Sequence, residues 1–114
     1  MLNLIPLPPV TPTYVQVNIG RNVEGKPMTA SEWARFKALV QSNLEYATIG
    51  RGVVSVHEGR GAWQDEHGNT VSEDSAYFST FAVVDIPALR TALAKARMLF
   101  WQDAIALIVG SELI

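Results

Sequence analysis

Few side chains in this sequence could transfer a proton, and His57 is the most promising of them. The chain has two histidines, His57 and His67, and no cysteine. A thiolate nucleophile, a thiolate metal site and a disulfide are therefore excluded. A general acid or base needs to lie beside the reacting atom, with neighbours that adjust its protonation. His57 as acid or base, with Asn18 and Tyr14 as polarising or orienting groups, is the one constellation that qualifies.

His57 also has a simpler interpretation as a surface or interface residue. Consecutive side chains of a strand point to opposite faces, so Glu58 cannot orient His57 or share a ligand with it. His67 follows Asp65 and Glu66 in a predicted turn, where exposed polar residues are ordinary. Imidazole and carboxylate groups suit a borderline metal, but this spacing does not gather them. We therefore predict neither a metal site nor a cofactor.

Arginine stands next to glycine three times, at Arg21, Arg51 and Arg60. Exposed backbone amides near a guanidinium can hold an anion. None of the three segments matches a phosphate loop or a dinucleotide fingerprint, because the spacing and the following helix are missing. We expect turn glycines with solvated arginines, and we retain Arg21, Arg60 and Trp63 as binding candidates.

The composition limits the classes of partner. The chain has 114 residues, of which 48% are hydrophobic and 18% charged, with 9 basic and 11 acidic side chains and a net charge of −2. This indicates one globular domain. Nucleic acid and anionic membranes attract basic proteins, and no apolar stretch approaches the roughly 20 residues of a membrane span. We predict no nucleic-acid or membrane partner, and a cytoplasmic location.

A Pro-rich arm, residues 1–13, precedes a single domain over residues 14–114. Its prolines break any helix, and no basic residue precedes Arg21, so we expect the arm not to act as a secretory signal. We expect polyproline II or irregular structure that packs on its own domain or on a partner subunit. A Pro-rich ligand for an aromatic groove is the alternative.

Periodicity predicts the first strand and the first helix. Residues 14–19 alternate apolar and polar, which is typical of a half-buried strand. Thr29 and Glu32 have the spacing of a capping box, which opens a helix. The expected apolar stripe of this helix is Trp33, Phe36, Val40 and Leu44, with Leu39 beside it.

A long β-hairpin is predicted next. Residues 53–63 form its first strand, which contains Gly59 and Gly61, and glycine inside a strand suggests a bulge or a bend. After a polar turn the second strand covers residues 70–84, with an interruption at Glu73–Ser75.

The second helix and the last strand complete the chain. Asp85 is the expected N-cap, and Pro87 fits the first turn. A short apolar run at residues 105–109 predicts the last strand. The expected stripe of the helix is Ile86, Leu89, Leu93, Ala96 and Phe100.

The order strand, helix, strand, strand, helix, strand predicts an α+β fold of the ferredoxin-like type, βαββαβ. Right-handed crossovers then give a four-stranded antiparallel sheet with a long central hairpin and both helices on one face. The strand over residues 70–84 is apolar on both sides, so we expect its helix-free face to be partly covered, and the chain to form a homodimer. That face should carry Tyr14, Gln16, Asn18, Ser55 and His57.

Several segments resemble a bacterial family of small domains of unknown function with this strand–helix order. They are Val17–Arg21, Met28–Phe36, Gly59–Trp63, Gly68 and Glu73–Ser75, and the resemblance runs from Tyr14 to Val109. Asn18 departs from the pattern, which has a more aromatic first strand. The resemblance implies the fold and carries no activity.

Two functions follow from these observations. The first is a non-enzymatic binding or interaction module that uses the helix-free sheet face to dimerise, or to meet a protein or small-molecule partner. The second is a small cofactor-free enzyme of the dimeric α+β barrel type, with His57 as acid or base. A closed, mostly apolar pocket over His57 would favour the enzyme, and a flat face would favour the module.

Overall fold

A computed structural model describes residues 11–50 and 52–110. Most of the Pro-rich arm, together with Arg51, lies outside the described residues. Two helices and seven strands follow one another along this part of the chain. They are β1 (Thr13–Gly20), β2 (Asn22–Val23), β3 (Lys26–Pro27), α1 (Ala30–Ala47), β4 (Thr48–Ile49), β5 (Ser55–Gln64), β6 (Thr70–Val84), α2 (Ile86–Leu99) and β7 (Ala106–Gly110).

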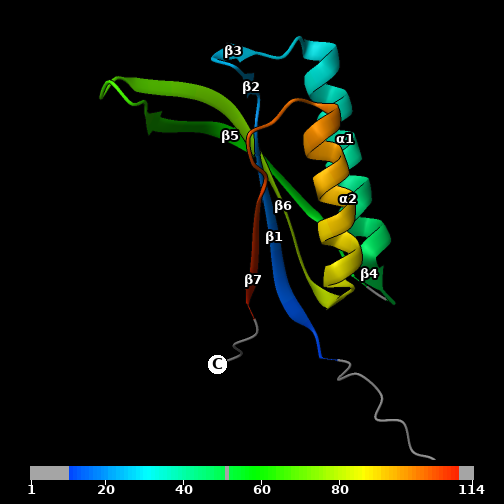
Figure 1. Cartoon of the computed structure of the whole chain (residues 1–114). Coiled ribbons are helices and arrows are strands. Elements are labelled where there is room, and N and C mark those ends of the chain that lie inside the picture. The colour runs from blue at the N-terminus through cyan, green and yellow to red at the C-terminus, as the bar shows by residue number, and fades with distance from the viewer. Residues whose placement is uncertain (1–10, 51, 111–114) are drawn as a thin grey trace, which may run out of the picture.

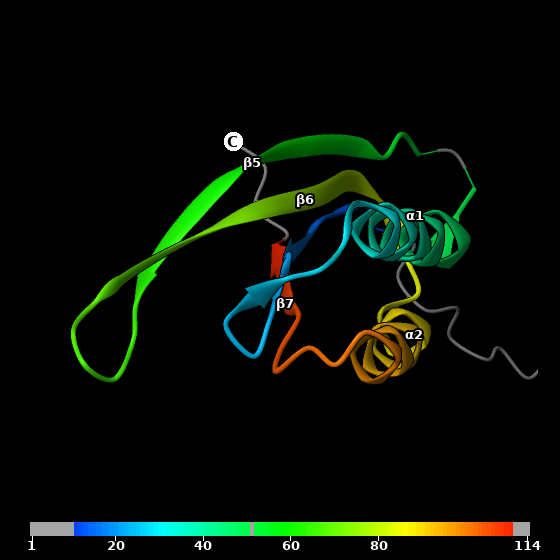
Figure 2. The same ribbon diagram turned by 90° about the horizontal axis from the view of Figure 1, so that it is seen from above.

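The molecule has two layers, a twisted sheet and a pair of helices on one side of it (Figures 1 and 2). The sheet has the order β4-β6-β1-β7, and β5 also pairs with β6. Every pairing is antiparallel. The predicted α+β class is confirmed, with an antiparallel sheet and two helices. The predicted count of four strands is wrong, because β4 adds a fifth strand to the sheet by pairing with the end of β6. The short strands β2, β3 and β4 lie in segments for which the sequence predicted no strand.

The core lies between the helices and the facing side of the sheet. Buried residues alternate along β1, as period-two patterning predicts. The predicted stripe of α1 is buried, with Phe36, Val40 and Leu44 fully enclosed and Trp33 only 7% exposed. Side chains of the sheet that face these helices include Val15, Val17, Ile19, Ala76 and Phe78.

Both helix starts match the predictions. The Thr29 hydroxyl accepts from the Glu32 backbone N–H, and the Glu32 carboxylate accepts from the Thr29 N–H. This pair of bonds satisfies two amides that have no partner within the helix. Asp85 caps α2 by accepting from the Ala88 N–H at 3.1 Å. No helix of the described residues is long and apolar enough to cross a membrane.

The β5–β6 hairpin is more regular than the sequence predicted. The expected interruption at Glu73–Ser75 is wrong, because β6 runs unbroken over 15 residues. Of the two alternatives predicted for the glycines, a bulge is wrong, because Gly59 and Gly61 pair one to one with Ser75 and Glu73. The hairpin does curve along its length (Figure 2). Polar residues stay in the strand here because neighbouring groups satisfy their side chains, as described below.

The far half of this hairpin projects beyond the sheet (Figures 1 and 2). The pairing of β1 with β6 ends at Gly20 and Ser75, whereas β5 and β6 continue to pair as far as Gln64 and Thr70. We call residues 60–74 the hairpin arm. Across from its base, Asn22–Pro27 forms a small hairpin of its own, turning at Glu24 and Gly25 with φ of 49° and 79°. Positive φ at both turn residues is typical of a type I′ turn.

Candidate functional site

The face of the sheet away from the helices gathers the polar residues that the sequence placed there. Strand register aligns Gln16 with Ser79 and Asn18 with Tyr77 on one side of β6. On the other side of β6, Ser55 and His57 align with the same two residues. We call this surface the helix-free face. Its members on the paired strands are Tyr14, Gln16, Asn18, Ser55, His57, Tyr77, Ser79, Phe81 and Ile108.

A row of hydrogen bonds runs along β1 on this face. The Tyr14 hydroxyl donates to Gln16 Oε1 at 2.6 Å, and Gln16 Nε2 donates to Asn18 Oδ1 at 2.8 Å. Each side chain therefore fixes the rotamer of the next. The row presents oriented amide and hydroxyl groups rather than free ones.

His57 stacks on Tyr77, with ring centroids 4.4 Å apart and planes tilted by 15°. Asn18 lies on the other side of Tyr77, so His57 and Asn18 are separated by two strand spacings, roughly 10 Å. The structure thus places Tyr14, Asn18 and His57 on one face without bringing the first two into contact with the imidazole. Among the described residues, no carboxylate pairs with His57, whose side chain is exposed.

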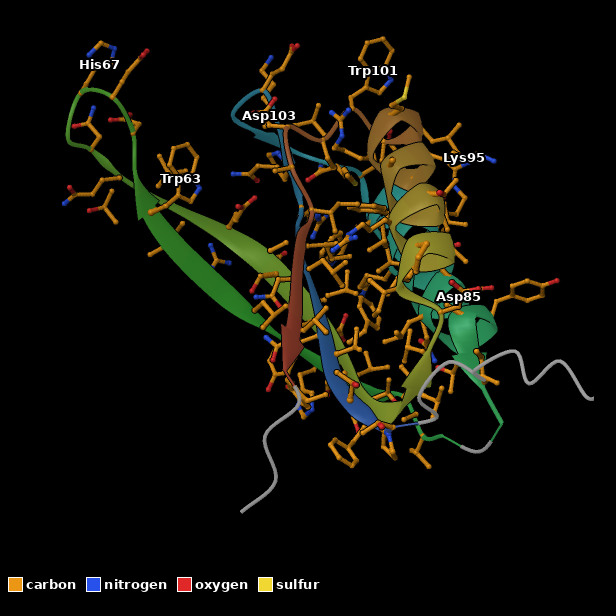
Figure 3. The ribbon with its side chains drawn as sticks, turned by 60° about the horizontal axis from the view of Figure 1, so that its bottom comes forward. Trp63, His67, Asp85, Lys95, Trp101 and Asp103 are labelled. Atoms are coloured by element: carbon orange, nitrogen blue, oxygen red, sulfur yellow. The ribbon has the colours of Figure 1, made fainter. Side chains whose placement is uncertain are left out.

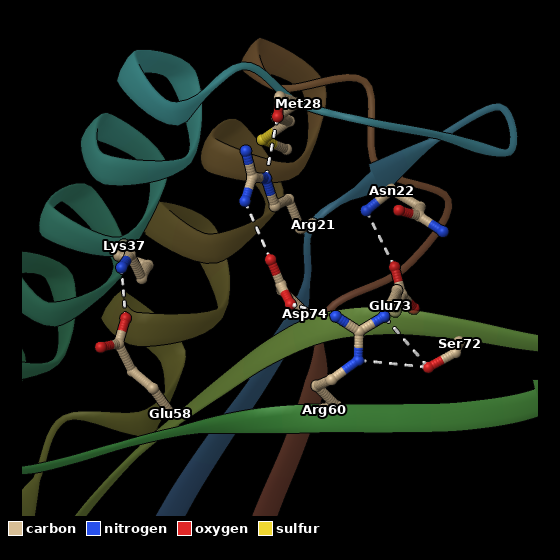
Figure 4. Close-up of polar contacts among 9 residues, drawn as sticks. All are labelled: Arg21, Asn22, Met28, Lys37, Glu58, Arg60, Ser72, Glu73 and Asp74. Atoms are coloured by element: carbon tan, nitrogen blue, oxygen red, sulfur yellow. Dashed lines mark hydrogen bonds and ion pairs between the residues drawn. The ribbon is translucent and has the colours of Figure 1, made fainter.

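A carboxylate that the sequence analysis passed over lies at the base of the hairpin arm. Glu73 Oε2 accepts from the Asn22 backbone N–H at 2.8 Å (Figure 4). Its carboxylate covers Gly20 so closely that a Cβ there would come within 2.7 Å of Glu73 Oε1. The absence of a side chain at Gly20 therefore makes room for the charged group.

Two more glycines border this carboxylate on β5. Gly61 pairs with Glu73 and Gly59 with Ser75, so both lie on the same face. A Cβ at Gly59 would meet nothing within 4 Å, which leaves open space above the backbone. We call Gly20, Gly59, Gly61, Glu73 and Ser75 the hairpin-root patch. Its nearest members, Gly59 and Ser75, lie two positions along their strands from His57 and Tyr77, which is a distance of about 7 Å.

The helix-free face and the hairpin-root patch together offer a ligand two kinds of contact, ring stacking and hydrogen bonding to a carboxylate. A stacked aromatic pair offers a flat surface for another planar ring. A carboxylate accepts hydrogen bonds only, and bonds to an ionised acceptor are stronger than neutral ones. Glycine allows a ligand to approach the backbone closely. A planar ligand with hydrogen-bond donors at one end fits this combination.

The two arginines retained from the sequence lie elsewhere. Arg21 Nη1 donates to Asp74 Oδ2 at 2.8 Å, and Arg21 Nε donates to the Met28 carbonyl oxygen at 2.8 Å. Arg60 Nη1 reaches the other oxygen of Asp74 at 3.1 Å. Figure 4 shows Asp74 between the two guanidinium groups, away from Glu73. The strand alternation turns Asp74 toward the helix side, so Arg21 joins the hairpin arm to the body and Arg60 bonds within the arm, both away from the helix-free face.

His67 lies at the tip of the hairpin arm (Figure 3). Its Nε2 is 3.6 Å from Glu66 Oε1, and both side chains are largely exposed. The described residues contain no group of three or more histidine and acidic side chains placed to hold a metal.

Comparison with known proteins identifies solved structures of similar fold. No family model matches the chain, and no curated protein matches it. Among solved structures, the chain is similar to a phage SAM lyase in complex with S-methyl-5′-thioadenosine. That match has a TM-score of 0.59 and 14% identity, and it covers 96% of this chain and 88% of that one. The same comparison with a phage SAM lyase in the apo state gives 0.58 and 16%, covering 95% and 86%.

A second similar structure is a DUF3240 family protein from Shewanella baltica. The TM-score is 0.50 and the identity 14%, over 90% of this chain and 91% of that one. The resemblance to small bacterial domains of unknown function is thus supported at the level of fold. Identities this low show a shared fold alone.

Sequence reasoning missed Glu73, Ser75 and Tyr77 as members of a site. The acidic pair Glu73 and Asp74 suggested an interruption of the strand, because both residues disfavour strands in isolation. One signal was available: Gly59, Gly61 and Gly20 lie in or next to strands, where glycine marks a close approach of another group. Which side chain approaches these glycines depends on how β1, β5 and β6 are aligned, and no local sequence pattern determines the register of strands that are so far apart in the chain.

Proposed function

We propose that this chain binds a small planar ligand of the nucleoside type on its helix-free face, at the hairpin-root patch. The observation that carries the proposal is the Glu73 carboxylate over Gly20, beside two further glycines and one row from the His57–Tyr77 stack. Among the described residues, both helices lie on the other side of the sheet and neither covers this face.

The carboxylate is held in place for binding. Glu73 Oε2 accepts from the Asn22 N–H, and this bond fixes the orientation of the group. Oε1 has further acceptor capacity because each carboxylate oxygen offers two lone pairs. A ligand with hydroxyl or amino donors could use it.

The stacked rings of His57 and Tyr77 supply the second contact with the proposed ligand. The exposed His57 ring lies flat on Tyr77, and a purine base could extend that stack. The ligand class agrees with a protein of similar fold, the phage SAM lyase, whose structure holds S-methyl-5′-thioadenosine. That compound has a purine base and ribose hydroxyl groups, which match the stack and the carboxylate.

Calorimetric titration of the full chain with S-methyl-5′-thioadenosine tests the proposal. We expect saturable binding that Glu73→Gln weakens at least tenfold, because a charge-assisted hydrogen bond is worth about 1.5–3 kcal/mol. The glutamine can still accept from Asn22, so the fold should survive. Glu45→Gln, which changes an exposed carboxylate on α1, should bind as the parent does. Absence of binding, or equal binding by the Glu73 variant, would overturn the proposal.

An activity assay with the full chain and two histidine variants distinguishes binding from catalysis. If His57 acts as acid or base, incubation with SAM should produce S-methyl-5′-thioadenosine, and His57→Ala should lower the rate by about 10²–10⁴-fold. His67→Ala should leave the rate unchanged. Without an orienting carboxylate on His57, we expect binding and no turnover.

A second function is favoured by a different observation, the apolar end of the same face. Tyr14, Phe81 and Ile108 are 38%, 44% and 46% exposed and lie on three adjacent strands. We propose that a second copy covers them in a two-fold contact. Light scattering should then give a mass above that of a monomer, and Phe81→Glu should lower this mass by removing the two-fold contact. Tyr46→Glu, at a site on α1 that is 95% exposed, should leave the dimer intact; a parent mass that stays monomeric at every concentration would refute this function.

A further inference from the structure

The hairpin arm is the least supported part of the described structure. Beyond Gly20 and Ser75, the last β1 pair, the backbone N–H of Arg21 still donates to the Asp74 carbonyl oxygen at 2.9 Å, and farther out the two strands of the arm pair with each other only. An isolated two-stranded hairpin is marginally stable in water. The ion pairs of Asp74 hold the base of the arm, but they do not reach Trp63, which is 48% exposed near the tip. A large aromatic residue on a projecting strand is a typical anchor for a protein partner.

A surface that could receive this anchor lies on the opposite flank of the molecule. Between α2 and the edge strand β7 there is a hollow of about 250 Å³. Leu93, Ile105 and Leu107 supply apolar walls, and Arg90 and Arg97 stand at its rim. Arg97 donates to the Gln102 carbonyl oxygen, whereas Arg90 is exposed. The hollow is below the usual range for a drug-sized ligand, and its size suits one large side chain.

The charges of the two surfaces are complementary. Asp65 and Glu66 follow Trp63 by two and three residues at the turn of the arm. Arg90 and Arg97 flank the apolar hollow, and Lys95 adds to the basic side of α2. Figure 3 shows Trp63 on the projecting arm and Lys95 on the other flank. The arm therefore points away from the hollow of its own chain, and only another molecule can bring the two together.

We propose that the hairpin arm of one copy docks on a second copy, with Trp63 in the α2–β7 hollow and the Asp65–Glu66 turn facing Arg90 and Arg97. Such a contact joins two different surfaces, so every copy both gives an arm and receives one. Head-to-tail contacts of this kind close into a ring or continue as a filament. This interface differs from the two-fold contact proposed for Tyr14 and Phe81, and it does not depend on ligand binding.

The test is the mass of the full chain by analytical ultracentrifugation over a range of concentrations. We expect an assembly larger than a monomer, which Trp63→Ala weakens about thirtyfold or more, the effect of a hot-spot residue. Trp101→Ala changes a residue that is 78% exposed but lies outside the proposed contact, and it should have no effect. Phe81→Glu should also leave this assembly in place, which separates it from the two-fold contact.

A charge exchange adds a second, independent readout. Glu66→Arg and Arg90→Glu should each weaken association about tenfold, and the variant with both changes should recover most of the affinity, because the pair is restored with its signs reversed. Glu66 is preferable to Asp65, whose carboxylate accepts from two backbone amides of the turn. Glu45→Arg is the matched control. A parent that stays monomeric, an unaffected Trp63→Ala variant or a double variant without recovery would each overturn the proposal.

Discussion

The packed body and the hairpin arm are stabilised by different forces. In the body, apolar side chains from α1, α2 and β1 meet on one side of the sheet, and the largest of them are fully enclosed. In the arm, most residues are exposed and none is buried, and polar contacts of Arg21, Arg60 and Asp74 hold its base. The body therefore supplies the free energy of folding, and the arm holds functional groups at a defined place beside it.

The sharpest test of this contrast compares two tryptophans. Trp33 is 7% exposed in the body, and Trp63 is 48% exposed on the arm. We expect Trp33→Ala to lower the free energy of unfolding by about 3–5 kcal/mol, the range for large aromatic residues in cores. Trp63→Ala should lower that of the monomer by less than about 1 kcal/mol. Urea titrations measure both, and equal losses would show that the arm is part of the core.

The next largest effect is expected where the arm joins the body. The Arg21 side chain is 23% exposed and bonds both Asp74 and the Met28 carbonyl oxygen, whereas the Arg60 side chain is 67% exposed. Arg21→Ala should reduce stability by about 1–3 kcal/mol, because it leaves partly buried acceptors without their donor. Arg60→Ala should change it by less than about 1 kcal/mol, as exposed ion pairs do. Thermal unfolding of the two variants under the same conditions measures both losses of stability. A larger loss for Arg60→Ala than for Arg21→Ala would contradict the prediction.

Substitution of Gly20 should affect ligand binding much more than it affects stability. An alanine there would displace the end of the Glu73 side chain, which is flexible, so the change should reduce stability by less than about 1 kcal/mol. The same shift removes the carboxylate from the hairpin-root patch and should abolish binding of S-methyl-5′-thioadenosine. Gly25→Ala serves as a control, since that glycine has a positive φ and lies outside the patch. It should reduce stability and leave binding intact, and a Gly20→Ala variant that binds normally would refute the role of Glu73.

The smallest effect is expected at the start of α1. Hydrogen bonds from the Thr29 backbone N–H, and next from its side chain, lower the pKa of Glu32 below 4.5. A group with a depressed pKa in the folded state stabilises the fold above its unfolded pKa, and this contribution is lost as the pH falls through the folded value. The stability difference between the parent and Glu32→Gln should therefore shrink on acidification below about pH 4.5. Unfolding at pH 7 and pH 3 measures it; a difference that grows at low pH would have the wrong sign.

Local patterns predicted much of the body. The stripe of Trp33, Phe36, Val40 and Leu44 follows from helical spacing, and the caps at Thr29 and Asp85 follow from single residues and their neighbours. These features depend on contacts within a few positions of each other. For the same reason, alternation in β1 identified which residues face the helices.

The candidate site could be predicted only in part, because its contacts join distant segments. Tyr14, Asn18 and His57 were assigned to the right face by alternation, but their distances depend on the register of β1, β5 and β6. Arg21 and Asp74 are 53 positions apart, and Asn22 and Glu73 are 51 apart. The sequence therefore suggested solvated arginines, whereas the fold pairs Arg21 and Arg60 with the one carboxylate of Asp74.

The place of β1 in the sheet has a consequence for how the protein is made. This strand is the first of the described elements to be synthesised, yet it lies between β6 and β7, and its Val15 pairs with Thr80 and with Val109. Ribosomes add about 5–20 residues per second, so roughly 5 to 20 seconds separate the synthesis of β1 from that of its last neighbour. Until β6 is made both edges of this strand lack a partner, and the edge that pairs with β7 lacks one for the whole interval, a condition that favours aggregation. The described sheet can therefore be completed only after β7, its last strand, has been made.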